Sequence, residues 1–121
     1  MMNGLPWHDA ELVDLQVNRF KDRLRISVCW PDDDEGCITV IQFVQCYLLK
    51  CNFNFAVAPP DHILVATYSE TSPLLEEFKS VWNGLIDLSS LKNFSIHTNS
   101  SNSSIEILAT GFSILSQRNA E

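Results

Sequence analysis

The stretches LVDLQVN (residues 12–18) and RLRISVCW (residues 23–30) carry the clearest structural signal in the sequence. Apolar and polar residues alternate in both, and this period of two is typical of a β-strand with one buried face. A short polar segment separates the two runs, which favours an antiparallel hairpin. We therefore expect a core built from β-structure that includes this hairpin.

Residues 37–57 form a second β-rich stretch that follows a loop at residues 31–36. Its 21 residues exceed the usual length of one strand, and the phase of the apolar positions changes along it. We predict two strands here, broken or bulged near residues 44–47. A further short strand is expected at residues 63–68.

The C-terminal third predicts a second hairpin. Alternating residues at 94–97 and a strand over residues 105–115 flank a polar Asn/Ser turn at residues 98–104. Residues 117–121 are polar, and we expect a frayed tail.

One helix is expected between these regions. Thr71, Ser72 and Pro73 combine a hydroxyl cap with a first-turn proline, and Gly84 is a plausible terminator. Apolar residues then recur three and four positions apart, which predicts one apolar helix face: Leu74, Leu75, Phe78, Val81, Trp82 and Leu85.

These elements predict the α+β class. We expect one domain of 121 residues with a curved, mostly antiparallel sheet of about six strands and one packed helix. Closure of the sheet into a sandwich or a partial barrel stays open at this point.

The net charge is −7, and the isoelectric point is about 4.7. Such a charge disfavours binding to nucleic acids and to anionic membranes, and it favours a basic partner. The longest apolar stretches are too short to span a membrane, and residues 1–14 lack the features of a signal peptide. We therefore expect a cytoplasmic protein. Its four cysteines contain no C-x-x-C pair, so buried free thiols are expected.

No sequence motif of a known catalytic or nucleotide-binding type occurs, and four glycines are too few for a glycine-rich phosphate loop. We expect no enzymatic activity, no catalytic residue, no metal ligand and no cofactor. The alternative is a small-ligand or metal site that combines residues distant in sequence: His8, Asp9, His62 and His97.

The charged residues cluster in two places. A basic run contains Arg19, Lys21, Arg23 and Arg25, for which pairing across the hairpin with Asp14 or Gln16 is the simplest role. The densest cluster is acidic and lies in the loop after residue 31. We predict that it binds a basic protein partner, with a merely solvated loop as the alternative: Asp32, Asp33, Asp34 and Glu35.

Both ends of the chain resemble a known family. WHDAEL (residues 7–12), with Leu15, resembles the start of small bacterial immunity-type proteins of contact-dependent and polymorphic toxin systems. IEILA (residues 105–109), with Phe112 and Ile114, resembles their C-terminal part. The resemblance implies a protein that blocks a toxin by binding it, and it gives no individual residue a role.

The leading hypothesis is therefore a non-enzymatic binding protein whose partner is a basic toxin domain. Two alternatives remain: the His/Asp ligand site, and a structural subunit or homodimer that uses the apolar residues 47–57 as a sheet edge or interface.

Overall fold

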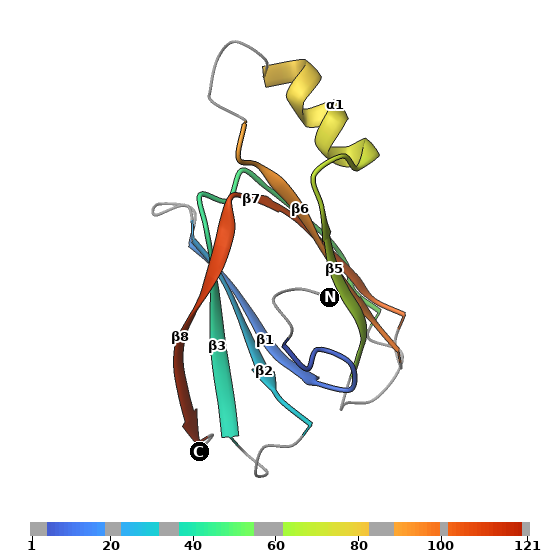
Figure 1. Ribbon diagram of the computed structural model, residues 1–121. Helices are drawn as coiled ribbons and strands as arrows, with labels where there is room; N and C mark the ends of the chain where they lie inside the picture. The colour runs from blue at the N-terminus through green and yellow to red at the C-terminus, as the bar shows by residue number, and fades with distance from the viewer. Residues whose placement is uncertain are drawn as a thin grey trace.

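The computed structural model describes residues 5–18, 23–31, 37–54, 62–82, 89–99 and 102–119, with the backbone alone for Cys37 and residues 116–119. These residues form eight strands in two antiparallel four-stranded sheets, and one helix (Figure 1). The first sheet contains, in spatial order, β1 (Glu11–Asn18), β2 (Arg23–Cys29), β3 (Cys37–Val44) and β8 (Gly111–Asn119). The second contains β4 (Leu48–Asn52), β7 (Ser104–Ala109), β6 (Lys92–Thr98) and β5 (Ile63–Ser69). The α+β class is confirmed, and the arrangement is a sandwich with more strands than expected.

The predicted hairpin is formed by β1 and β2. Leu24 and Ile26 of β2 are buried, whereas Arg25 between them is only half-buried. The register places Gln16 opposite Arg25 and Asp14 opposite Ser27. Arg25 donates from Nε to Gln42 Oε1 at 3.0 Å. The predicted position of Gln16 across from an arginine is therefore confirmed, whereas among the described residues no arginine lies opposite Asp14, so that part of the prediction is wrong. Arg19 and Lys21 lie outside the described residues.

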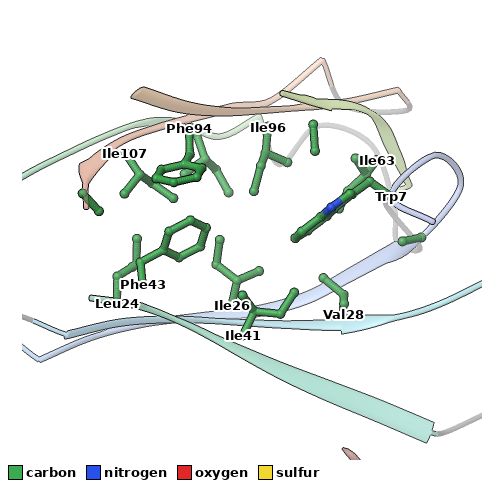
Figure 2. Close-up of a cluster of buried hydrophobic side chains, with 14 residues drawn as sticks. Trp7, Leu24, Ile26, Val28, Ile41, Phe43, Ile63, Phe94, Ile96 and Ile107 are labelled. Atoms are coloured by element: carbon green, nitrogen blue, oxygen red, sulfur yellow. The ribbon is translucent and has the colours of Figure 1, made fainter. Parts of the chain in front are cut away.

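The core fills the space between the sheets and is mainly aromatic and aliphatic (Figure 2). Phe43 of the first sheet and Phe94 of the second meet with ring centroids 5.2 Å apart. Trp7, which precedes β1, is fully buried and packs edge-on against Trp30 at 5.2 Å. Figure 2 shows Trp7 beside Ile63, within the layer that separates the sheets. Aromatic rings from both sheets therefore hold the layers together.

Two strand connections pass from one sheet to the other at a single corner. The chain leaves β3 at Val44, turns at Gln45 with a φ of 49°, and enters β4 at Leu48. The returning chain leaves β7 at Ala109 and enters β8 at Gly111. Thr110 donates its backbone N–H to Val44 O at 3.2 Å, and Tyr47 N–H donates to Leu108 O at 2.8 Å. The β3/β8 and β4/β7 pairs therefore form one bent ladder.

Three predictions from the sequence concern this corner and the strand β8 that follows it. The predicted break near residues 44–47 is confirmed. The predicted single strand over residues 105–115 is wrong, since the chain changes sheet at Thr110. The expected frayed tail is also wrong up to Asn119, because β8 continues that far and its last residue pairs with Cys37.

The N-terminal segment joins the outer edges of the two sheets formed by β1 and β5. Asp9 N–H donates to Ile63 O, and Ile63 N–H donates to Ala10 O, both at 2.8 Å. A β-bridge then connects Glu11 with His62. This contact holds β5 against the start of β1.

The helix α1 (Pro73–Trp82) lies on the outer face of the second sheet (Figure 1). Ser72 is its N-cap, since Leu75 N–H donates to Ser72 Oγ at 3.1 Å, which confirms the predicted helix start. Leu75 packs with Leu91 and Leu108 in a second, smaller apolar cluster. Gly84 lies outside the described residues. No helix in the described part of the chain is long and apolar enough to cross a membrane.

Three cysteines have described side chains, Cys29, Cys46 and Cys51, and they form no disulfide, as expected, but they are not all buried. Cys29 and Cys46 are half-buried, whereas Cys51 on the edge strand β4 is exposed. Partial burial nevertheless raises the pKa of the Cys51 thiol, because desolvation disfavours the thiolate. The expectation of burial is therefore wrong for Cys51.

Candidate functional site

The predicted partner-binding loop, with Asp32, Asp33, Asp34 and Glu35, lies outside the described residues. Its role in binding stays a prediction.

The histidines of the alternative ligand site have separate neighbours. His8 places Nδ1 2.9 Å from Leu64 O and Nε2 3.6 Å from Asp9 Oδ2, at a surface where both side chains are exposed. His97 Nε2 instead lies 3.7 Å from Glu106 Oε1. Among the described residues, no three His, Cys, Asp or Glu side chains lie close enough to hold a metal ion. The geometry therefore gives no support to the predicted alternative of a shared metal site.

A polar network around Glu106 occupies the outer face of the second sheet. Ser95 Oγ donates to Glu106 Oε2 at 2.5 Å, and Asn93 Nδ2 donates to the same oxygen at 2.9 Å. Ser95 and Glu106 are direct partners in the β6/β7 register, and Lys50 lies opposite Glu106 on β4. These residues contribute to a hollow of about 510 Å³ that also reaches the start of α1.

The network extends from the sheet to the helix. Ser72 Oγ donates to Asn93 Oδ1 at 2.6 Å, while the same oxygen accepts the Leu75 N–H that begins α1. Asn93 is almost fully buried, and it links Ser72 to Glu106. The chain of hydrogen bonds therefore fixes the first turn of the helix to the centre of the sheet.

This arrangement differs from that of a catalytic serine and histidine. A nucleophilic serine donates its proton to an imidazole that a carboxylate orients from behind. Here the Ser95 hydroxyl donates to the carboxylate itself, and His97 lies near the opposite carboxylate oxygen. The carboxylate thus separates the two groups, and the geometry fits an anchor for the helix better than an active site.

An exposed aromatic surface lies beside this network, where α1 passes over the edge strand β4. We define the aromatic surface as Tyr47, Leu48, Phe78, Val81 and Trp82. The Phe78 ring centroid lies 6.2 Å from that of Tyr47 and 6.1 Å from that of Trp82. Val81 is 66% exposed, Trp82 44% and Tyr47 41%.

All residues of the aromatic surface except Tyr47 line a hollow of about 390 Å³. The rest of its lining consists of Leu49, Lys50, Leu74 and Glu77. Large exposed aromatic and aliphatic side chains with a polar rim are typical of surfaces that bind other proteins. The aromatic surface is therefore our candidate functional site.

The sequence patterns predicted neither the aromatic surface nor the polar network around Glu106. The sequence predicts that Phe78, Val81 and Trp82 share one apolar helix face, but the helix buries mainly Leu75 against the sheet and leaves Val81 and Trp82 exposed. The apolar stripe of this helix is wider than the area that contact with one sheet can cover, and this width indicates that part of the stripe is exposed. Glu106 alternates with Ile105 and Ile107, so it resembled any solvated strand residue. Nothing in its spacing pointed to Asn93 or Ser72.

Comparison with models of known protein families finds no match, and comparison with curated proteins finds no similar one.

Proposed function

We propose that this chain is a non-enzymatic binding protein whose partner is a basic protein domain, consistent with a toxin-neutralising immunity protein. The observation that carries the proposal is the aromatic surface. Trp and Tyr dominate the energetics of protein interfaces because each buries much area and loses few rotamers on binding. Trp82 and Tyr47 are available for such contacts because each is roughly half exposed.

Charge supports the choice of a basic partner. The chain carries −7, so a positively charged domain would be attracted over distances of about a Debye length, roughly 8 Å at physiological salt. In this proposal the aromatic surface supplies most of the binding energy, and carboxylates such as those of residues 32–35 accelerate association. The family resemblance at both ends of the chain agrees with a toxin domain as the partner.

The test uses the protein encoded beside the gene for this chain. Purified wild type should bind that protein, and co-expression should relieve its toxicity. Trp82→Ala should weaken binding by about 2 kcal/mol, or about 30-fold, mainly through faster dissociation. Replacing residues 32–35 by their amides should instead slow association and reduce its salt dependence.

Tyr68→Ala is the matched control, since Tyr68 is an aromatic residue of similar exposure, 50%, on β5 at the other edge of the same sheet. It should bind within about twofold of wild type. The proposal is wrong if the neighbouring gene encodes no toxic basic domain, if wild type fails to bind it, or if Tyr68→Ala and Trp82→Ala weaken binding equally.

A further inference from the structure

The outer face of the first sheet carries two arginines of β2, Arg23 and Arg25. They alternate with the buried Leu24 and Ile26, so their side chains share the face that points away from the core. Two residues along a strand span about 7 Å, so one carboxylate can reach both guanidinium groups. Arg25 is held in place, because its Nε donates to Gln42 Oε1 at 3.0 Å.

Both arginines are half-buried, yet neither has a carboxylate partner. The two ion pairs in the described part of the chain both involve a histidine, His8 or His97. The hydrogen bond to Gln42 uses only Nε of Arg25 and leaves its terminal nitrogens available. Removing a charge partly from water without giving it a counter-ion is unfavourable. A carboxylate that approaches from outside the chain would compensate that loss.

The strands of the first sheet carry few acidic residues. Those strands contain only Glu11 and Asp14, both in the first half of β1. Asp14 lies opposite Ser27, which is four residues from Arg23, or about 13 Å along the strand. This exceeds the Debye length of about 8 Å at physiological salt, so the carboxylate is largely screened from Arg23. The connection at residues 19–22, which lies outside the described residues, has two basic side chains and one acidic side chain.

Arg23 lies between two hollows that lead towards the aromatic surface. The first hollow, of about 530 Å³, is lined by both arginines together with Gln16, Val17 and Asn18. The second, of about 420 Å³, extends from Arg23 across the corner to Cys46, Tyr47, Leu48 and Leu49. Tyr47 and Leu48 also belong to the aromatic surface. A protein that covers the aromatic surface can therefore reach Arg23 without leaving the chain.

We propose that the partner protein places an aspartate or glutamate side chain against Arg23 and Arg25, and an adjacent apolar side chain in the second hollow. This inference rests on the proposed function and specifies the chemistry of its partner: a domain that is basic as a whole, with a carboxylate in its interface. A guanidinium binds a carboxylate through two parallel N–H···O bonds, which fix the orientation of the pair. The arginine contact thus orients the partner, while the aromatic surface supplies buried area.

The experiment compares Arg23→Gln with Lys92→Gln in binding to the protein encoded beside the gene for this chain. Both changes remove one positive charge, and Lys92 is also half-buried, on β6 of the second sheet. If these charges acted only at long range, both variants would bind a basic partner faster, because the chain becomes more acidic. We expect Arg23→Gln instead to weaken binding at least about tenfold through faster dissociation. Lys92→Gln should bind at least as tightly as wild type.

Charge reversal identifies the partner's carboxylate. Arg23→Glu should weaken binding more than Arg23→Gln does, because it opposes two like charges. Replacing one acidic residue of the partner by lysine should restore binding to Arg23→Glu, whereas the same change should weaken binding to wild type.

Urea denaturation of the free chain separates binding from a structural role. The Arg23 side chain has no hydrogen bond or ion pair to any of the described residues, so Arg23→Gln should keep the wild-type urea midpoint. A clearly lower midpoint would assign Arg23 to the fold and contradict the inference, whatever the partner.

The binding results distinguish this inference from the proposed function. If Trp82→Ala weakens binding but Arg23→Gln does not, the proposed function stands and the arginine contact is wrong. If wild type fails to bind the partner, both are wrong. If Arg23→Gln leaves partner binding unchanged but abolishes binding of inorganic phosphate to the free chain, the arginines hold a small anion and the inference is again wrong.

Discussion

Replacing Asn93 by alanine should loosen the helix from the sheet and destabilise the whole fold. The side chain donates to the Glu106 carboxylate at 2.9 Å and accepts from Ser72 Oγ at 2.6 Å. A hydrogen bond to a charged group contributes about 1.5–3 kcal/mol and a neutral one about 1 kcal/mol. Glu106 keeps a 26% exposed side chain, so water can replace part of what it loses. We therefore expect Asn93→Ala to lower the free energy of unfolding by about 2–3 kcal/mol.

The assay is urea denaturation followed by circular dichroism, with thermal unfolding as a second measurement. At about 2.1 cal/mol/K of unfolding entropy per residue, the expected loss lowers Tm by about 8–12 °C. The control is Asn52→Ala, because Asn52 is an exposed asparagine of β4 in the lining of the same hollow. Its free energy of unfolding should stay within about 0.5 kcal/mol of wild type.

Hydrogen exchange separates the helix anchor from a general loss of stability. Under native conditions, the amides of Leu75 and Glu76 bond to Ser72, so they should exchange faster in Asn93→Ala by a larger factor than the amides of β7. The reasoning fails if Asn93→Ala lowers the free energy of unfolding by less than about 1 kcal/mol. It also fails if the helix amides keep their wild-type protection relative to β7.

Three further predictions concern the core, the corner and the edge strand. Phe43→Ala should cost about 3–5 kcal/mol by urea denaturation, because it removes ring contacts to both sheets; a cost below about 1.5 kcal/mol would contradict the packing. Thr110→Val keeps the backbone bond to Val44 but removes the hydroxyl 3.0 Å from Gln45 Oε1; it should cost about 1 kcal/mol in the same assay, and a gain in stability would be inconsistent with the corner. Partial burial raises the pKa of the Cys51 thiol, so alkylation of Cys51 should reach half of its maximal rate at a higher pH in the folded than in the unfolded chain; a lower midpoint in the folded chain would contradict the partial desolvation of the thiol.

The local elements of this fold could be predicted well from sequence. The alternation of Leu24, Ile26 and Val28 identified β2, because every second side chain of a strand faces the same layer. Ser72 and Pro73 identified the helix start through local backbone chemistry. Signals of this kind depend on residues close in the chain, so one sequence contains them completely.

The division into two sheets could not be predicted in the same way. Alternation shows that a strand has a buried face, but it does not say which strands share a sheet. Thr110 interrupts an apolar run without a proline or a charge, and it marks the corner only because Val44 lies beside it. Asn93, Ser72 and Glu106 are likewise ordinary polar residues until the fold brings them together. The division into sheets and the polar network depend on contacts between residues that are distant in sequence.

The single corner also determines how the molecule tolerates change in length. Because one bent ladder runs through both layers, a deletion or insertion of one residue between Val44 and Leu48 would turn the inward side chains outward in one layer relative to the other. Insertions in the loops between other strands leave the inward and outward faces of the two layers unchanged relative to each other. We therefore expect the length of the chain at this corner to be constrained much more tightly than the length of the loops. A library of random single-residue insertions should yield folded variants at almost every turn but rarely at the corner.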